Sequence, residues 1–180
     1  MNGLTKRSSE REPAVSPRDK SDAAGGWLPS LAFALSFASY SMSWDAVIVR
    51  IRGPFRPISD VAANDYLPLG TLNSVAAAVR AAFPDAEWDS PSHAHRELGE
   101  HTGMMIELGN VETSNSIHVS VSGPGNPVRD LLSLANANGW IVIDCSSSEF
   151  IDPASLVSEG FAGYKAMWHD LQRRAGTNEG

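Results

Sequence analysis

Three of the five histidines lie in one short polar segment, which also carries two glutamates. The segment reads His93-Ala-His95-Arg-Glu97-Leu-Gly-Glu100-His101. Imidazole and carboxylate groups are ligands for zinc and other transition metals, so a metal-dependent ligand binder is one chemistry to consider. No helical spacing fixes a third ligand, however, and a solvated polar loop explains these residues more simply. We therefore predict no metal ligand and no cofactor.

A second set of reactive side chains lies on two segments that alternate between apolar and polar residues. His118 and Ser120 belong to the first segment, and Asp144 belongs to the second. A histidine base that is oriented by a carboxylate can activate a hydroxyl, which makes a small enzyme the alternative hypothesis. The spacing does not establish contact, and no Gly-x-Ser-x-Gly turn presents a nucleophile. A half-solvated sheet face is the simpler explanation, so we assign no catalytic residue.

Two further features look like catalytic elements, but a structural role explains them better. Gly123-Pro-Gly125 precedes a predicted helix, yet Pro124 and Pro127 remove backbone donors that a phosphate cradle needs, and no lysine follows. The single cysteine, Cys145, ends a predicted strand, where a buried thiol is usually inert. It cannot form an internal disulfide, which favours a reducing compartment and a cytoplasmic location.

The charge of the chain indicates which class of partner to expect. The net charge is −7, but residues 45–171 hold 7 Lys and Arg against 16 Asp and Glu, a difference of −9. Such a surface repels phosphate backbones and attracts a basic protein, so we expect no nucleic acid partner. The side chains expected to contact a basic partner are Asp85, Glu87, Asp89, Glu97, Glu100, Glu107 and Asp144. Solubility alone is the competing explanation for the acidity.

The first 41 residues are expected to lie outside the domain. Residues 1–26 are rich in Ser, Lys, Arg, Glu, Pro and Gly, which predicts disorder. Residues 27–42 are apolar, but Pro29 and several serines interrupt a stretch that is too short to span a bilayer. A secretory signal ending near Ala38 is an alternative, although the region before it is long and contains acidic residues. We interpret residues 1–41 as disordered or as an upstream extension before a true start at Met42, and we expect no membrane segment.

Residues 42–171 predict one α+β domain that positions the polar residues described above. Residues 72–83 have helical spacing, with Thr71 or Gly70 as the cap. Asn126 and Pro127 are expected to start a second helix, which Gly139 ends. A third apolar stripe, formed by Phe161, Tyr164, Trp168 and Leu171, predicts a C-terminal helix, and residues 172–180 are expected to be a flexible tail. Four alternating segments predict strands, with these buried positions: Val47, Val49, Ile51, Met104, Ile106, Leu108, Ile117, Val119, Val121, Ile141, Ile143 and Cys145.

The order strand, helix, strand, strand, helix, strand predicts a ferredoxin-like fold. This is a two-layer sandwich with a four-stranded antiparallel sheet in βαββαβ order, plus the C-terminal helix. Right-handed crossovers should bring the first two helices to the same face. Residues 84–102 are expected to form a long loop, in which Glu87-Trp88 could form a short edge strand. The last helix is expected to cover part of the other face. That open face would consist of Arg50, Arg52, Met105, Glu107, His118, Ser120, Ser122, Trp140, Val142 and Asp144.

Three short motifs follow one another near the C-terminus: Gly139-Trp140-Ile-Val-Ile-Asp144, Glu149-Phe150 and Gly160-Phe-Ala-Gly163-Tyr164. Together with residues 117–127, they resemble a widespread family of small bacterial α+β proteins without assigned function. The resemblance covers most of residues 45–168, and its motifs are structural rather than catalytic. Such proteins are also similar to the immunity proteins that neutralise bacterial toxins, in size, acidity and single-domain build.

These observations favour a non-catalytic, acidic binding protein of the bacterial cytoplasm. An immunity protein that blocks a basic toxin is the more specific hypothesis. One alternative is a small enzyme or metal-dependent ligand binder that uses His118 and Asp144, or the segment from His93 to His101. The other alternative is a homodimer that pairs through the open sheet face.

Overall fold

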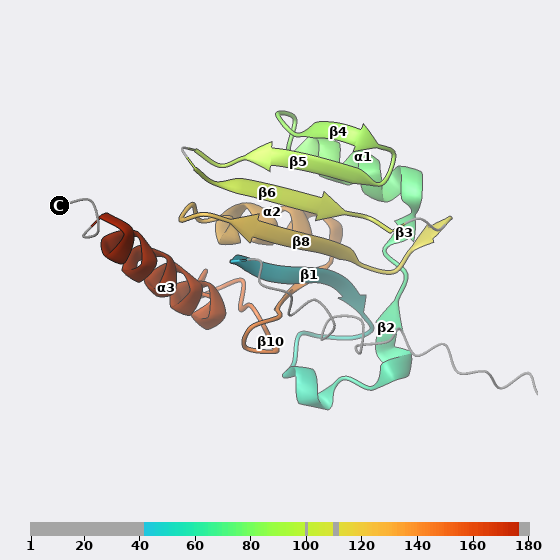
Figure 1. Ribbon diagram of the computed structural model, residues 1–180. Coiled ribbons are helices and arrows are strands. Elements are labelled where there is room, and N and C mark those ends of the chain that lie inside the picture. Colours follow the sequence, from blue (N-terminus) through green and yellow to red (C-terminus); the bar gives the residue numbers. More distant parts are fainter. Residues whose placement is uncertain (1–41, 100, 110–111, 177–180) are drawn as a thin grey trace, which may run out of the picture.

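The computed structural model describes residues 42–99, 101–109 and 112–176, which form a large antiparallel sheet and three α-helices (Figure 1). The longer strands are β1 (Ser43–Ile51), β4 (Glu87–Ser90), β5 (His93–Glu97), β6 (Gly103–Glu107), β8 (Ile117–Ser122) and β9 (Ile141–Asp144). The short strands are β2 (Tyr66–Leu67), β3 (Gly70–Thr71), β7 (Thr113–Ser114) and β10 (Glu149–Phe150). The helices are α1 (Leu72–Ala82), α2 (Val128–Asn138) and α3 (Glu159–Gly176), with short 3-10 helices at Ile58–Asp60 and Ala63–Asp65.

The predicted four-stranded ferredoxin-like sandwich is wrong, because the main sheet has 8 strands. Its order is β10-β9-β1-β8-β6-β5-β4, with β2 also paired to β1. The largest addition is the β4–β5 hairpin, which lies in residues 84–102, where a long loop with no more than a short edge strand near Glu87-Trp88 was expected. Ala94 is the only fully buried residue of these two strands, so their sequence lacks the regular apolar alternation that identifies a strand.

Strands β1 and β9 turn toward the helices the face that was predicted to point away from them. Ala46 and Ile48 of β1 and Val142 of β9 belong to the main core, whereas Ile51 and Ile143 belong to a smaller cluster on the other face. Both strands lie inside the sheet and are apolar on both faces, so their period-two pattern does not distinguish one face from the other. The predicted common interior is therefore wrong for Val47, Val49 and Ile51 of β1 and for Ile141 and Ile143 of β9, which lie on the other face. It is confirmed for Met104, Ile106, Leu108, Ile117, Val119 and Val121.

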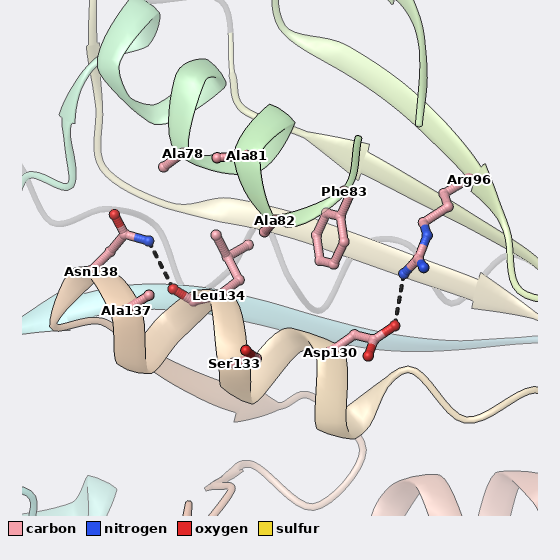
Figure 2. Close-up of a pocket in the computed structure, with 10 residues that line it drawn as sticks. All are labelled: Ala78, Ala81, Ala82, Phe83, Arg96, Asp130, Ser133, Leu134, Ala137 and Asn138. Atoms are coloured by element: carbon pink, nitrogen blue, oxygen red, sulfur yellow. Dashed lines mark hydrogen bonds and ion pairs between the residues drawn. The ribbon is translucent and has the colours of Figure 1, made fainter. Parts of the chain in front are cut away.

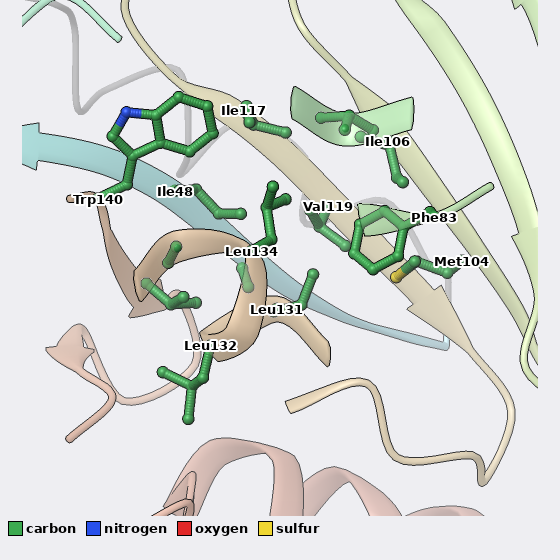
Figure 3. Packing of buried hydrophobic residues seen from close by; sticks show 14 of the residues in the cluster. Ile48, Phe83, Met104, Ile106, Ile117, Val119, Leu131, Leu132, Leu134 and Trp140 are labelled. Carbon is green, nitrogen blue, oxygen red and sulfur yellow. The ribbon is translucent and has the colours of Figure 1, made fainter. Parts of the chain in front are cut away.

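The main core lies between the sheet and the two helices α1 and α2. Figure 3 shows the part of this core that packs against α2. Thr71 caps α1, as predicted, because its hydroxyl accepts a hydrogen bond from the Ser74 amide. Asn126 accepts a hydrogen bond from the Val128 amide at the start of α2. Gly139 ends α2 in the left-handed conformation, with φ at 66°. Caps and apolar stripes therefore fix both helices over one face of the sheet.

The opposite face of the sheet is covered at one end only. Ile58, Val61 and Tyr66, from the segment between β1 and α1, pack on the smaller apolar cluster that includes Val49 and Phe150. The remainder of this face, over β4, β5, β6, β8 and the start of β1, is exposed in the part of the chain that the structure describes. We call this remainder the open face.

The C-terminal helix α3 does not cover the open face, which corrects the prediction. Its Phe161 and Tyr164 join the main core, and the Phe161 ring lies edge-on to Trp44 at 5.2 Å between centroids. Trp140, which α3 was expected to cover on the open face, also faces the main core. The C-terminal end of α3 extends away from the sheet (Figure 1).

The two predicted ends of the chain have different outcomes. Helix α3 continues to Gly176, so the first residues of the predicted tail 172–180 are helical. The predicted extension, residues 1–41, lies outside the described residues, as do residues 177–180. Among the described residues, no helix is both long and apolar enough to cross a membrane.

Candidate functional site

The open face places histidines and carboxylates side by side, and the strand register determines this arrangement. Directly paired residues of antiparallel strands lie on the same face. Val47 pairs with His118, His118 with Glu107, and Glu107 with His93. The neighbouring row, in the same way, consists of Asp45, Ser120, Met105, His95 and Glu87.

Glu107 lies between two imidazole rings at the centre of this face. Its Oε2 is 3.7 Å from Nδ1 of His118, and its Oε1 is 3.8 Å from Nε2 of His93. On its other side, His118 has Nε2 at 3.9 Å from Oδ1 of Asp45. Four side chains from β1, β8, β6 and β5 therefore alternate acid, base, acid, base across the sheet.

His95 has a carboxylate pair of its own at the edge strand β4. Its Nε2 is 3.3 Å from Oε2 of Glu87, and its Nδ1 is 3.8 Å from Oδ1 of Asp89. The side chains of Glu87 and Asp89 are 80% and 61% exposed. Most of the contacts on this face exceed normal hydrogen-bond length and are screened by water, so they hold the carboxylates only weakly. Glu97, two residues after His95 on the same strand, adds a fifth exposed acid.

The open face lacks a compensating cation from its own strands. Strands β4, β6 and β8 contain no Lys or Arg. Arg96 of β5 lies on the helix side, where it forms ion pairs with Asp85 and Asp130 at 2.9 and 2.7 Å. Arg50 of β1 alternates with Val49 and lies on the same side as Ile48.

The ion pairs of Arg96 also remove Asp85 from the predicted partner-binding set. A hydrogen bond from Arg96 holds the pKa of Asp85 below its usual value. Partial burial lowers the pKa of Arg96, but hydrogen bonds to Asp130 and Asp85 raise it above the ordinary value. This network links β5 to α2 and lies away from the open face.

Asp144 is a buried structural carboxylate, and it lies on the helix side of the sheet. It is 1% exposed. Its Oδ1 accepts hydrogen bonds from the Trp44 indole at 3.1 Å and from the Ser146 amide at 2.9 Å. Its Oδ2 accepts one from the Ser158 hydroxyl, just before α3 begins. A side chain at Gly160 would overlap both carboxylate oxygens, so only glycine fits there.

The structure therefore does not assemble the trio of His118, Ser120 and Asp144. His118 and Ser120 lie on the open face, and Asp144 lies beneath it, among the core residues. The acid beside His118 is Asp45 instead. Asp45 was missed in the sequence because Val47 and Val49 were predicted to face the helices, which would place Asp45 on the helix side as well.

The remaining predicted residues divide clearly. Glu87, Asp89, Glu97 and Glu107 are together on the open face, and Glu100 lies outside the described residues. The histidine segment is not a loop, because His93 and His95 lie in β5. Among the described residues, no group of His, Cys, Asp and Glu has the geometry to hold a metal ion.

The three motifs behind the family resemblance have packing roles. The Tyr164 hydroxyl accepts a hydrogen bond from the Gly123 amide at 2.8 Å and donates one to the Met42 carbonyl at 3.0 Å. Phe161 packs on Trp44, while Trp140 fills the core and Asp144 joins β9 to the start of α3. These residues attach α3 to the sheet and provide no reactive group.

A groove of about 380 Å³ lies between α1 and α2, but its lining is structural (Figure 2). Alanines of α1 and Phe83 form one wall, and Leu134 and Ser133 lie on the other. The Arg96–Asp130 ion pair closes one end. The Asn138 amide donates to the Leu134 carbonyl at 2.8 Å, so its polar group is satisfied within the helix. We assign no function to this groove.

Cys145 lies at the end of β9 beside the open face. Burial, followed by the charges of Asp45 and Asp144, raises the pKa of its thiol to about 11. The thiol therefore remains protonated at neutral pH, and a protonated thiol is a poor nucleophile.

Comparisons of the chain with protein-family models, curated proteins and solved structures find no match. The family resemblance therefore rests on its motif residues alone.

Proposed function

We propose that this chain is a non-catalytic binding protein of the bacterial cytoplasm, and that its open face receives a basic protein partner. One observation carries the proposal. Five carboxylates, four of them exposed and Asp45 half-buried, lie together on this face, with no Lys or Arg from the same strands among them: Asp45, Glu87, Asp89, Glu97 and Glu107. A surface of one sign steers an oppositely charged partner and selects against others.

An apolar side chain near the middle of the face supports a protein partner. Met105 is 41% exposed, and it is paired with Ser120 on one side and His95 on the other. Protein interfaces commonly have an apolar centre and a charged rim, and methionine adapts to the shape of its partner. A free metal ion or a small cation would not need this side chain.

An immunity protein that neutralises a basic toxin is the specific form of this proposal. The acidic face and the motif resemblance support it. Nucleic acid is a poor partner for this face because phosphates would meet carboxylates. A homodimer paired through the same face is disfavoured for the same reason, since like charges would lie opposite one another.

An enzyme is less well supported by the open face. The ring nitrogens of His118 lie 3.7 and 3.9 Å from their carboxylate neighbours, on an exposed surface. The groove between α1 and α2 and the hollow beside Asp144 both lie away from this histidine. Catalysis benefits from a site that excludes water and fixes its proton acceptor, and a flat face provides neither.

The test uses purified basic proteins encoded by genes adjacent to the gene for this chain. Calorimetry would give Kd at two salt concentrations, and we expect affinity to fall as salt rises. Glu87→Gln combined with Glu107→Gln should weaken binding about tenfold or more, because both charges face the partner. The matched control is Glu149→Gln, an exposed acid that pairs with Asp144 and so lies on the other face. Equal losses in the double variant and the control would contradict the proposal.

A further inference from the structure

We infer that His93, His95 and His118 make the open face a pH-dependent surface that loses affinity for a basic partner on acidification. The inference rests on the proposed function and concerns its regulation. It is motivated by the alternation of imidazoles and carboxylates across the sheet, with contacts from 3.3 to 3.9 Å. Histidine is the residue whose charge ordinarily changes between about pH 5 and pH 8.

The strand order explains why the histidines affect every acid around them. The acids of the two rows lie on β1, β6 and β4, and the histidines lie on the strands between them, β8 and β5. Neighbouring strands are about 4.8 Å apart. A partner cation that approaches one of these carboxylates is therefore also close to an imidazole.

The groups that face each histidine are acidic or neutral. Asp45 of β1 and Glu107 of β6 face His118, and Glu107 also faces His93. The partner of His93 on β4 is Ser90, which is neutral. The groups that face His95 are Glu87 and Asp89 of β4 and Met105 of β6. No Arg or Lys of the paired strands faces any of the three.

Protonation changes both the charge and the availability of the carboxylates. Five carboxylates with neutral histidines give the face a formal charge of −5, and three protonated histidines reduce it to −2. Each imidazolium would also form an ion pair with a carboxylate that is already within 3.9 Å. A basic partner then meets a weaker field and has to displace an internal cation.

The experiment measures binding of an oligolysine peptide of about twelve residues to the full chain. Lysine keeps its charge throughout the range used, so the peptide does not contribute to the pH dependence. At constant ionic strength, we expect Kd to be about tenfold or more weaker at about pH 5.5 than at about pH 7.5. The triple variant His93→Asn, His95→Asn, His118→Asn should bind at both pH values with nearly the same Kd.

Two controls separate this effect from a general effect of pH. His169→Asn changes an exposed histidine of α3, and it should keep the full pH dependence. Thermal unfolding of each variant checks that the fold is intact, which is expected because His95 and His169 are exposed and His93 and His118 are only half-buried. The inference is overturned by a chain whose Kd does not change with pH, or by a triple variant that retains the change.

The outcomes also distinguish this inference from the proposed function. Binding that depends on Glu87 and Glu107 but is independent of pH would overturn the pH dependence and leave the acidic site supported. Absence of binding at both pH values would overturn both. Binding that is unaffected by Glu87→Gln and Glu107→Gln would also overturn both, because the peptide would then be held elsewhere.

Discussion

Asp144 and Glu107 are carboxylates on strands of the same sheet, but they lie on opposite faces and have different surroundings. Asp144 is 1% exposed, with donors at 2.9 and 3.1 Å. The side chain of Glu107 is 48% exposed, with imidazole nitrogens at 3.7 and 3.8 Å. A buried carboxylate has to be hydrogen-bonded, so the structure is built around it. An exposed carboxylate is not bound in this way and remains free for a partner.

The largest expected effect comes from replacing Asp144, and the replacement of Glu107 is its comparison. Asp144→Ala should lower the free energy of unfolding by about 3–5 kcal/mol, because it leaves the buried donors of Trp44 and Ser158, and the partly buried Ser146 amide, without an acceptor. Glu107→Ala should change it by about 0.5 kcal/mol or less. Urea denaturation measures both values. Similar losses for the two variants would remove the distinction between the faces.

A pair of glycines in α3 tests how closely the helix approaches Asp144. Gly160→Ala should destabilise the protein by about 2 kcal/mol, because the added Cβ would overlap the Asp144 carboxylate. Gly163→Ala is the matched control, since no atom other than those of its chain neighbours and its own helix backbone lies within 4 Å of its Cβ position. Alanine is the better helix former, so this control should be stabilised by up to about 1 kcal/mol. Thermal melting measures the Tm of both variants. A Tm of Gly160→Ala above that of Gly163→Ala would contradict the packing described for α3.

A smaller effect is expected from the hydroxyl that joins α3 to the start of β1. Tyr164→Phe removes the bridge between the Gly123 amide and the Met42 carbonyl and should cost about 1–2 kcal/mol. Burial raises the pKa of Tyr164, followed by the charge of Asp45, while the hydrogen bond from Gly123 opposes the rise. The phenol therefore holds its proton to a higher pH in the folded state than in the unfolded state.

The pH dependence of Tyr164→Phe follows from this direction. The raised phenol pKa contributes to the free energy of unfolding. This contribution is complete below about pH 10 and is lost as pH increases through the folded-state pKa. Wild-type protein should thus lose part of its advantage over Tyr164→Phe in that alkaline range. Urea denaturation at about pH 8 and about pH 10.5 measures the difference. An advantage that increases with pH would contradict the assigned direction.

The same contrast between the faces explains what could be predicted from the sequence. Helices α1 and α2 and strands β6 and β8 each have one apolar side, so their patterns identified both the element and its buried face. Strand β1 is apolar on both faces around Ala46 to Val49, so its phase was ambiguous and Asp45 was missed. The β4–β5 hairpin has the reverse property. Its exposed polar side chains hid two strands, and these strands carry most of the candidate site.

The smallest effect is expected in the alkylation rate of Cys145, which reports the charge at the margin of the open face. With a pKa of about 11, its thiol should be alkylated roughly a hundredfold more slowly than a free cysteine at about pH 8. Asp45→Asn should lower this pKa and increase the rate severalfold, because the charge of Asp45 is the second cause of the shift after burial. Glu149→Gln is the control and should have little effect. A rate equal to that of a free thiol would mean that neither burial nor the charges of Asp45 and Asp144 act on this side chain. An unchanged alkylation rate in Asp45→Asn would mean that the charge of Asp45 does not act on the Cys145 thiol. The charges of the open face would then have no effect at the end of β9.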